Sequence, residues 1–520
     1  MKLKYLTCIC ILPLSMSVAY AQSPQSVLDK FKSEHPFLAL ENAALLKGIK
    51  MPGLGVSELG YLQDEGSLKH PFDAGSRKGI RFSAIRAHSL KNWDFYGTFS
   101  FKSYKEKEVA LTEMANPFRD NPYQVADSLS GEWNKQNYRL DARIAAPAFM
   151  NGKLTAGLGI GYEVLTGARQ KDPRPLDNSN QLELKPGIAY QLTPKSFLGL
   201  NGSYENYRED LTVELYNNRQ VYNIYKLLGL GEYEFSSPVL LSSGVITRSY
   251  LGNQLGGNLQ YGYNEGRLNV LASAGYTRHE EDVTDGTTYP QKGGRHSFNE
   301  YAALIALSWS GRPGFQQILF NWEQRDIDNR EYHQVQNSGT KEYETVYTSI
   351  FNTNLKTRST LSYLLNRRRQ NKLIWSFRAG AGYSGLDNRY ANPKSLEIID
   401  KFDGSLAFTR YIELKKAASL SFGIGSRYEF IHTDRLEYTE KSYSSNYIAH
   451  NIFIPIHAFL SVPSWNNQLQ LQYTFGPFAK SSNQLYIKAQ GYLNAAMKAG
   501  AGIEKGNTRQ GFLLSLGLYN

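Results

Sequence analysis

Residues 468–475 alternate strictly between neutral polar and apolar side chains. Gln470 and Gln472 fall on one side of an extended chain, and Leu469 and Leu471 fall on the other. An alternation with a period of two residues predicts a β-strand that has one wet face and one dry face.

The same alternation recurs along the chain, and a helical period fits none of the segments that show it. Several of these segments carry aromatic residues near their ends, as the interfacial girdles of membrane barrels do. Strands are predicted at residues 93–102, 137–144, 154–164, 182–192, 198–204, 255–263, 268–276, 301–309, 318–322, 359–365, 373–383, 402–408, 420–430, 452–462, 469–475, 485–493 and 512–520.

The predicted connections fall into two interleaved sets, one short and one long and polar. Short turns are expected at residues 90–92, 150–153, 193–195, 264–266, 311–314 and 463–467. Long loops are expected at residues 105–135, 208–253 and 280–297. This asymmetry is typical of an up-and-down barrel with periplasmic turns and external loops. Residues 221–250 fit either an external hairpin or two wall strands.

No stretch after the N-terminus approaches the 18 or more apolar residues that a membrane helix needs. A closed barrel is the other architecture that satisfies backbone polar groups in lipid. The composition agrees, because the 520 residues include 36 Tyr and 45 Gly and only 41% are hydrophobic. We therefore predict an all-β, transmembrane, antiparallel barrel of about 18 strands, within a range of about 16 to 20.

The N-terminus has the features of a secretory signal peptide. Lys2 and Lys4 precede an apolar stretch, and residues 19–21 give a small-x-small cleavage pattern. The alternative, an anchoring helix, needs a longer apolar run of roughly 20 residues. Because Cys8 and Cys10 both lie in this segment, the mature chain is expected to have no disulfide, cysteine ligand or cysteine nucleophile.

Three regions are predicted: a signal peptide at 1–21, an N-terminal segment at 22–53, and the barrel at 54–520. The middle region contains the one helix-like pattern, with Val27, Leu28 and Phe31 on one face. It either lies in the periplasm or enters the barrel as a small plug.

In lipid the leucines must face outward, so the polar partners of each strand face the lumen. Six cations and three anions among them suggest a modest preference for anionic solutes, and pairing of these charges across the lumen is an equal alternative. The formal net charge of +11 adds little, since much of it lies in turns such as 366–370. The lumen-lining candidates are Arg139, Asp141, Arg143, Glu323, Arg325, Arg378, Arg427, Glu429, Gln470 and Lys488.

Catalytic and metal-binding patterns are weak. Asp326 and Asp328, with His432 and Asp434, resemble the paired acids and acid–histidine pair of omptin proteases, but those barrels have ten strands. The pair at residues 296–297 lacks the spacing of the phospholipase dyad, and no histidine lies in a His-Glu-x-x-His arrangement. We expect no catalytic site, metal or cofactor.

Glycines at 157, 159 and 161 could suggest a phosphate-binding loop, but no helix-forming stretch follows them. Small residues on a curved strand explain them better.

Three stretches, at residues 57–62, 121–128 and 131–136, are similar to those of an uncharacterised family of outer-membrane β-barrel proteins from Bacteroidota. The last segment, 512–520, resembles the final strand of outer-membrane barrels generally, although Asn520 follows the aromatic Tyr519. The resemblance implies the fold and location, and no substrate.

The leading functional hypothesis is a non-enzymatic conduit for small polar solutes, with anionic ones as the narrower form. The second is a partner barrel for a surface lipoprotein or a TonB-dependent uptake system, contacted through residues 105–135 and 208–253. An omptin-like surface hydrolase that uses Asp326 or His432 is the third. All three imply contact with outer-membrane lipid, and none implies nucleic acid, because the basic turns lack a patterned aromatic surface.

Overall fold

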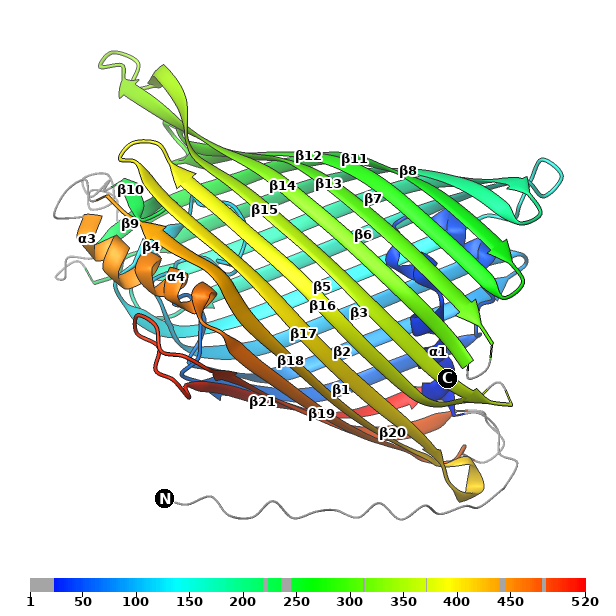
Figure 1. Ribbon diagram of the computed structural model, residues 1–520. Helices are drawn as coiled ribbons and strands as arrows, with labels where there is room; N and C mark the ends of the chain where they lie inside the picture. The colour runs from blue at the N-terminus through cyan, green and yellow to red at the C-terminus, as the bar shows by residue number, and fades with distance from the viewer. Residues whose placement is uncertain are drawn as a thin grey trace, which may run out of the picture.

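The computed structural model describes residues 23–217, 223–234, 245–311, 314–370, 372–439, 445–478 and 483–520. The predicted signal peptide at 1–21 lies outside these residues, as do positions 312 and 313 of one predicted turn. Across the described chain, 18 strands form one closed antiparallel sheet (Figure 1). The predicted all-β barrel and its strand number are confirmed.

The wall follows chain order, and β21 closes the barrel by pairing with β1 in a register that places Leu516 opposite Leu59. The wall strands are β1 (Leu54–Gly66), β2 (Ser76–Leu90), β3 (Trp93–Ala110), β5 (Ser130–Ala145), β6 (Leu154–Arg169), β7 (Arg174–Thr193), β8 (Ser196–Glu214), β11 (Val245–Glu265), β12 (Leu268–Asp285), β13 (Gln291–Ser310), β14 (Gly314–Gln336), β15 (Tyr343–Arg369), β16 (Lys372–Tyr390), β17 (Ser395–Glu413), β18 (Ser419–Glu437), β19 (Ser464–Thr474), β20 (Gln484–Ala496) and β21 (Thr508–Tyr519).

The apolar face of the wall points outward. Leu255 is 65% exposed and Leu469 is 51% exposed, whereas the alternating Gln472 is 3% exposed. A continuous apolar band of this kind is stable only against hydrocarbon, so the polarity is that of a bilayer-spanning barrel.

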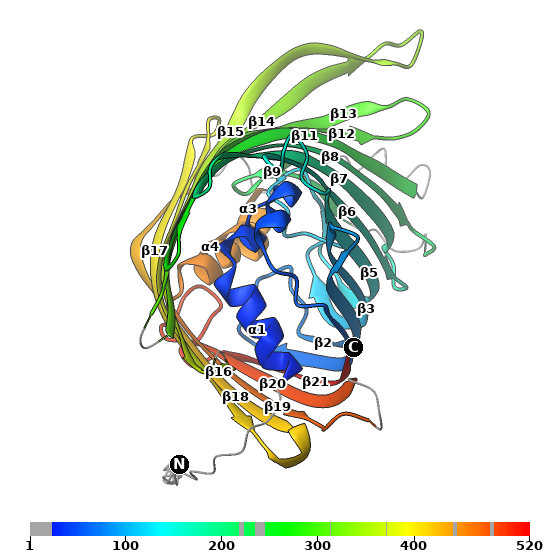
Figure 2. The ribbon, with the colours of Figure 1, turned by 90° about the vertical axis from the view of Figure 1, so that its right-hand side faces the viewer.

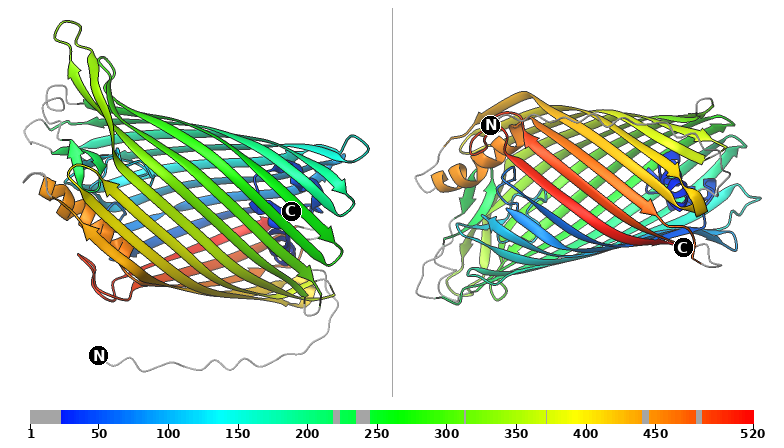
Figure 3. Two further views of the ribbon diagram at one scale, coloured as in Figure 1. Left: turned by 45° about the horizontal axis from the view of Figure 1, so that its top comes forward. Right: turned by 90° about the horizontal axis from the view of Figure 1, so that it is seen from below.

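The two barrel ends differ, as the connections predict, although two of the expected connections are wrong. Residues 280–297 are not a long loop, because β12 and β13 continue almost to the tip of their hairpin. Residues 464–467 belong to β19 rather than to a turn. The hairpin of β14 and β15 also projects beyond the barrel rim (Figures 1 and 3). We refer below to the short-turn end and the long-loop end.

The strand predicted at 452–462 is wrong, because this stretch is helical. It forms the π-helix η4 (Ala449–Phe453) and the helix α4 (Ile454–Ser461), which follow the short helix α3 (Ser445–Ile448). The run is apolar on both faces, and Pro455 sits in the first turn of α4, where proline is well tolerated. Periodicity alone does not separate a short apolar strand from a buried helix.

Two further groups of elements lie within the wall (Figure 2). The N-terminal group comprises α1 (Pro24–Glu34) and the 3₁₀ turns η1 (Pro36–Ala39) and η2 (Ala43–Gly48). The second is a three-stranded sheet of β4 (Val125–Asp127), β9 (Ile224–Gly229) and β10 (Glu232–Glu234). The described part of residues 221–250 is therefore an inward-folded hairpin followed by the start of β11.

The short 3₁₀ turn η3 (Lys415–Ala417) joins β17 to β18 at the short-turn end. None of the described helices has the length and apolarity needed to cross a bilayer.

Candidate functional site

The N-terminal segment lies inside the short-turn end of the barrel (Figure 2). Ser23 caps α1 by accepting a hydrogen bond from the backbone N–H of Ser26. The apolar face of α1 packs on neighbouring parts of the wall, with Leu28 against Tyr519 of β21 and Phe31 against Ala87 of β2. The helix lies across the lumen (Figure 2).

Polar contacts fix α1 to other strands. The Asp29 carboxylate accepts a hydrogen bond of 2.9 Å from the Tyr411 hydroxyl, and Gln25 donates one of 2.8 Å to Ser421. Glu34 pairs with Arg368 at the end of β15. Because these partners are side chains, the segment is attached to the wall and does not continue its sheet.

The second half of the segment packs on wall glycines. A Cβ at Gly157 would lie 2.3 Å from the backbone nitrogen of Ala44, and one at Gly187 would lie 2.2 Å from Oδ1 of Asn42. The Asn42 amide donates to the Ile188 carbonyl at 3.0 Å. Glycine is required at 157 by this close approach, so strand curvature is not its main explanation.

The long-loop end is closed by residues 111–129, which fold into the lumen. Met114 and Tyr123 pack against the inward-facing Leu211 and Tyr250 of the wall. The Tyr250 hydroxyl donates a hydrogen bond of 2.7 Å to the Tyr123 carbonyl. We call residues 111–129 the inner loop. It includes the 121–128 stretch of the family resemblance.

Ion pairs hold the tip of the inner loop. Arg119 bridges Glu209 of β8 and Glu281 of β12. Asp120 contacts Arg325 at 2.8 Å and Lys356 at 2.6 Å. Burial alone would raise the pKa of Asp120, but the two cations outweigh it and hold that pKa at about 2.

The base of the inner loop is held in the same way. Arg169 lies 2.7 Å from both Glu113 and Asp127, and the guanidinium and both carboxylates are almost completely buried. Burial and the neighbouring Asp127 raise the pKa of Glu113, despite the opposing charge of Arg169.

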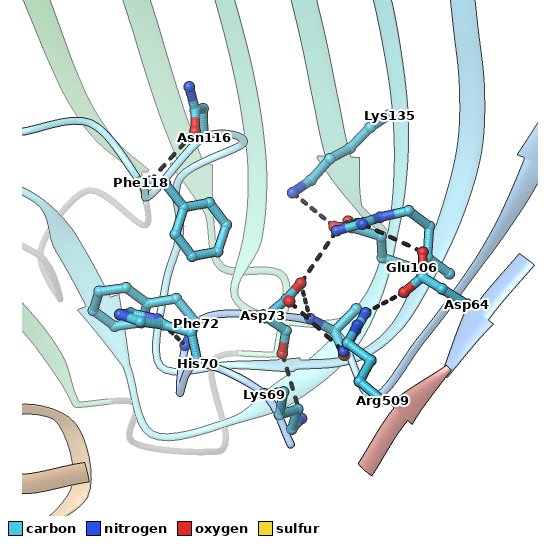
Figure 4. Close-up of polar contacts among 12 residues, drawn as sticks. Asp64, Lys69, His70, Phe72, Asp73, Glu106, Asn116, Phe118, Lys135 and Arg509 are labelled. Carbon is cyan, nitrogen blue, oxygen red and sulfur yellow. Dashed lines mark hydrogen bonds and ion pairs between the residues drawn. The ribbon is translucent and has the colours of Figure 1, made fainter. Parts of the chain in front are cut away.

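Three long-loop segments meet at an aromatic contact. The ring of His70, on the β1–β2 loop, lies 5.3 Å from Phe72, 5.3 Å from Phe118 of the inner loop and 5.6 Å from Phe459 of α4. Figure 4 shows Phe118 beside Phe72 and His70. Burial lowers the pKa of His70 to about 4, so this ring is neutral at pH 7.

A charged cluster beside the aromatic contact of His70 holds the β1–β2 loop (Figure 4). Arg77 reaches Asp73 at 3.1 Å and Glu106 at 2.6 Å. Lys135 pairs with the other oxygen of Glu106 at 2.8 Å, and Arg509 pairs with Asp64.

The helix α4 is docked on the wall through His457. Its Nδ1 lies 3.0 Å from Glu397 and its Nε2 lies 2.7 Å from Asp434. Burial would lower the pKa of His457, but the two carboxylates outweigh it and raise the pKa above its ordinary value.

The N-terminal segment and the inner loop are called the two closures below. A cavity of about 920 Å³ lies between them. Residues 39–41 bound it at the short-turn end, and residues 116 and 118–121 bound it at the long-loop end. Its charged lining contains seven acids and five cations. The acids are Glu41, Asp120, Glu183, Glu205, Glu281, Glu300 and Glu323, and the cations are Arg119, Arg139, Lys185, Arg325 and Arg358. We call this space the central chamber.

A second cavity of about 720 Å³ lies beside the central chamber, and Asn116 and Phe118 line both. Its inward-facing lining includes Arg81, Lys102 and Gln490. Neither Arg81 nor Lys102 is among the ten lumen candidates. No alternation reveals the strand that carries Arg81, whereas Lys102 is the last residue of the predicted strand at 93–102. We call this space the side chamber.

The ten sequence-derived lumen candidates lie on inward-facing positions of the wall, and most have polar partners. Arg139 pairs with Asp141 at 2.9 Å and with Glu163 at 2.8 Å. Arg143 donates to the Leu40 carbonyl at 2.6 Å, so it holds the N-terminal segment.

The remaining candidates lie in the central chamber, in the side chamber or at other inward-facing positions of the wall. Arg325 pairs with Glu323 at 3.3 Å in the central chamber, and Gln470 accepts a hydrogen bond of 2.8 Å from Gln490 in the side chamber. Lys488 pairs with Glu58. On the neighbouring strands, Arg427 pairs with Glu429 at 3.1 Å, and Arg378 makes no ion pair among the described residues.

The residues considered for hydrolysis do not come together. Asp326 and His432 lie on strands separated by β15, β16 and β17, and the His432 ring contacts the outward-facing Phe402. His296 is buried and bonds to Asn329, while Ser297 is on the opposite face of the same strand. Within the described ranges, no group of three or more His, Cys, Asp or Glu residues is arranged to hold a metal.

A family model described as "Family of unknown function (DUF6850)" matches residues 43–520. This confirms the resemblance to a family of unknown function, while an origin in Bacteroidota stays a prediction. No curated protein matches the chain.

Solved structures share the barrel architecture at low similarity. The ferric preacinetobactin receptor BauA from Acinetobacter baumannii is 9% identical with a TM-score of 0.42, covering 90% of this chain and 80% of the receptor. A Pseudomonas aeruginosa FadL homologue is 10% identical with a TM-score of 0.34, covering 94% of each chain. The RagAB peptide importer is 7% identical with a TM-score of 0.38, covering 90% and 87%. These likenesses concern the fold alone.

Proposed function

We propose that this chain, which belongs to the DUF6850 family of unknown function, is a gated, non-enzymatic conduit for small polar solutes across the outer membrane. The observation that carries the proposal is the polar central chamber, which lies between two closures that the chain itself supplies and has the side chamber beside it. The wall around them is complete, so solute passage requires movement only of elements that lie inside it.

The closures have the attachment expected of movable parts. Neither belongs to the wall sheet, and both are held to it by side-chain packing, ion pairs and hydrogen bonds. These are separate side-chain contacts, unlike the continuous backbone ladder of the wall, and the buried pairs among them are the costliest to break. We place the short-turn end in the periplasm and the long-loop end outside, as is usual for barrels of this type.

The experiment measures osmotic swelling of liposomes that contain the purified protein, with a pentose as the solute. We expect slow swelling with the full chain and faster swelling when residues 23–51 and 112–128 are both removed. If the double deletion folds into a barrel and its swelling is no faster than that of protein-free liposomes, the conduit proposal is wrong.

A disulfide lock supplies a matched control, because the chain has no cysteine beyond position 10. Ser33 and Asn366 touch across the α1–wall contact, with 2.9 Å between Oγ and Nδ2. In a protein with Ser33→Cys and Asn366→Cys, oxidation should hold α1 in place and abolish swelling, and reduction should restore the swelling. Swelling that is equal in both states would show that α1 does not gate the lumen.

A second candidate function, a partner barrel for a surface lipoprotein or TonB-dependent system, is favoured by the projecting β14–β15 hairpin. Val335, Val346 and Tyr347 are each more than half exposed there, outside the barrel wall. The inner loop, the core of the expected contact region 105–135, is folded inward and cannot serve. Removal of residues 331–349 should abolish co-purification of a partner from native membranes and leave swelling unchanged.

A further inference from the structure

Two cations in the side chamber face each other on neighbouring strands. Arg81 of β2 and Lys102 of β3 are direct partners in the antiparallel register, and both point inward. Like charges directly opposite each other destabilise a sheet. The usual remedy is a shared carboxylate, and among the described residues neither cation makes an ion pair.

The acids nearest to this pair are occupied elsewhere. Glu58 accepts from the Tyr486 hydroxyl at 2.7 Å and pairs with Lys488. Glu163 accepts from Arg139 at 2.8 Å and from Asn137 at 2.7 Å.

The remaining acids on this side belong to the charged cluster that holds the β1–β2 loop (Figure 4). Glu106 lies between Arg77 and Lys135, and Asp64 is paired with Arg509. The charged groups of the cluster thus neutralise one another, and the Arg81–Lys102 pair is left with excess positive charge.

The acids that line the side chamber are paired, and the surroundings of the Arg81–Lys102 pair also offer hydrogen bonds. The Arg81 Nε–H is buried and has no hydrogen-bond partner. The amides of Gln470 and Gln490 line the same chamber. An oxyanion is the group that would satisfy an unpaired guanidinium, an ammonium and amide donors at once.

We propose that Arg81 and Lys102 form a binding site for the carboxylate or phosphate group of a small solute. The site gives the solute class of the proposed conduit. Binding of the anion does not depend on the proposed function, and only its transport rests on that function. The side chamber of about 720 Å³ has room for a small organic anion. The central chamber, with its excess of acids, does not select anions.

The test is calorimetric titration of the folded full chain in a neutral detergent, with inorganic phosphate and with glutarate as probes. Both should bind, and choline should not. Arg81→Gln and Lys102→Gln should each weaken binding about tenfold or more, because each removes a charge-assisted hydrogen bond.

The matched control is Arg378→Gln, which removes another inward cation without an ion pair, at a position outside the side chamber. Binding should change less than about twofold, since distant charges in an aqueous lumen are screened. A variant with Arg81→Lys and Lys102→Arg keeps both charges and should retain binding even if the glutamine variants fail to fold.

The proposal is overturned if the intact protein binds neither probe, or if Arg378→Gln weakens binding as much as Arg81→Gln. Pentose swelling separates this outcome from failure of the conduit. Binding without swelling would retain the anion site and reject transport, whereas swelling without binding would retain the conduit and reject the site.

Discussion

Replacement of Asp120 by asparagine should release the tip of the inner loop. The Asp120 carboxylate is the shared partner of Arg325 and Lys356, on two neighbouring wall strands. Asparagine preserves the shape and removes the charge, so both cations lose their contact with the loop at once.

The size of the effect follows from the pKa of Asp120, which is held at about 2 against an ordinary value of 3.8. A difference of slightly less than two pKa units corresponds to about 2.5 kcal/mol of interaction with the ionised form, or about 2 kcal/mol once solvent screening is included. The side chain is only 25% exposed, so solvent screening reduces this moderately. Because the folded pKa is depressed, the stabilisation is complete above pH 3.8 and is lost as the pH falls through about 2.

The assay is hydrogen exchange of the backbone amides of residues 111–129, measured at pH 7. Loss of about 2 kcal/mol should raise the local opening equilibrium about 30-fold. Asp326→Asn is the control, because it removes the same charge from the strand that carries Arg325, on the outward face. The reasoning is refuted if exchange in Asp120→Asn matches that of the unaltered protein, or if Asp326→Asn accelerates it equally.

Three further changes probe other parts of the fold. Gly157→Leu should displace the N-terminal segment, since even a Cβ would clash with Ala44, and limited proteolysis should then cleave residues 23–51 faster. Docking of α4 through His457 should be strongest below pH 6.5 and weaken as the pH rises through the raised pKa; hydrogen exchange across α4 measures this, and His457→Gln should remove the pH dependence. Leu255→Arg should destabilise the barrel in lipid by about 2 to 4 kcal/mol in a denaturant titration, depending on its depth, whereas Val335→Arg in the projecting hairpin should have almost no effect.

Alternation along the chain predicts most of the wall, because each strand touches hydrocarbon on one face and polar surroundings on the other. It fails where that contrast is weak. The strand β2 carries Arg77 inward and Lys78 outward, so both of its faces look polar, and β1 next to it was also missed. In α4 both faces look apolar, since the helix packs on other parts of the chain.

The site could be predicted only in part, for a different reason. Alternation places Arg139 or Arg325 inward, but it does not say which residue meets them. Arg119 meets partners 90 and 162 positions away, and no local pattern links them. The inner loop contains enough polar residues to resemble an ordinary external loop, and its inward position depends on these long-range ion pairs.

Inward-facing apolar residues are the clearest feature of the sequence that indicates where the N-terminal segment and the inner loop pack inside the barrel. An inside-out wall has no reason to place such residues toward the lumen unless another part of the chain covers them. Leu271 and Ala306 point inward and are covered by Leu40 and Leu45 of the N-terminal segment. Leu211 points inward and is covered by the inner loop. Once the strand register is known, these departures from alternation locate both closures, and the uncovered polar wall between them is where a solute can bind.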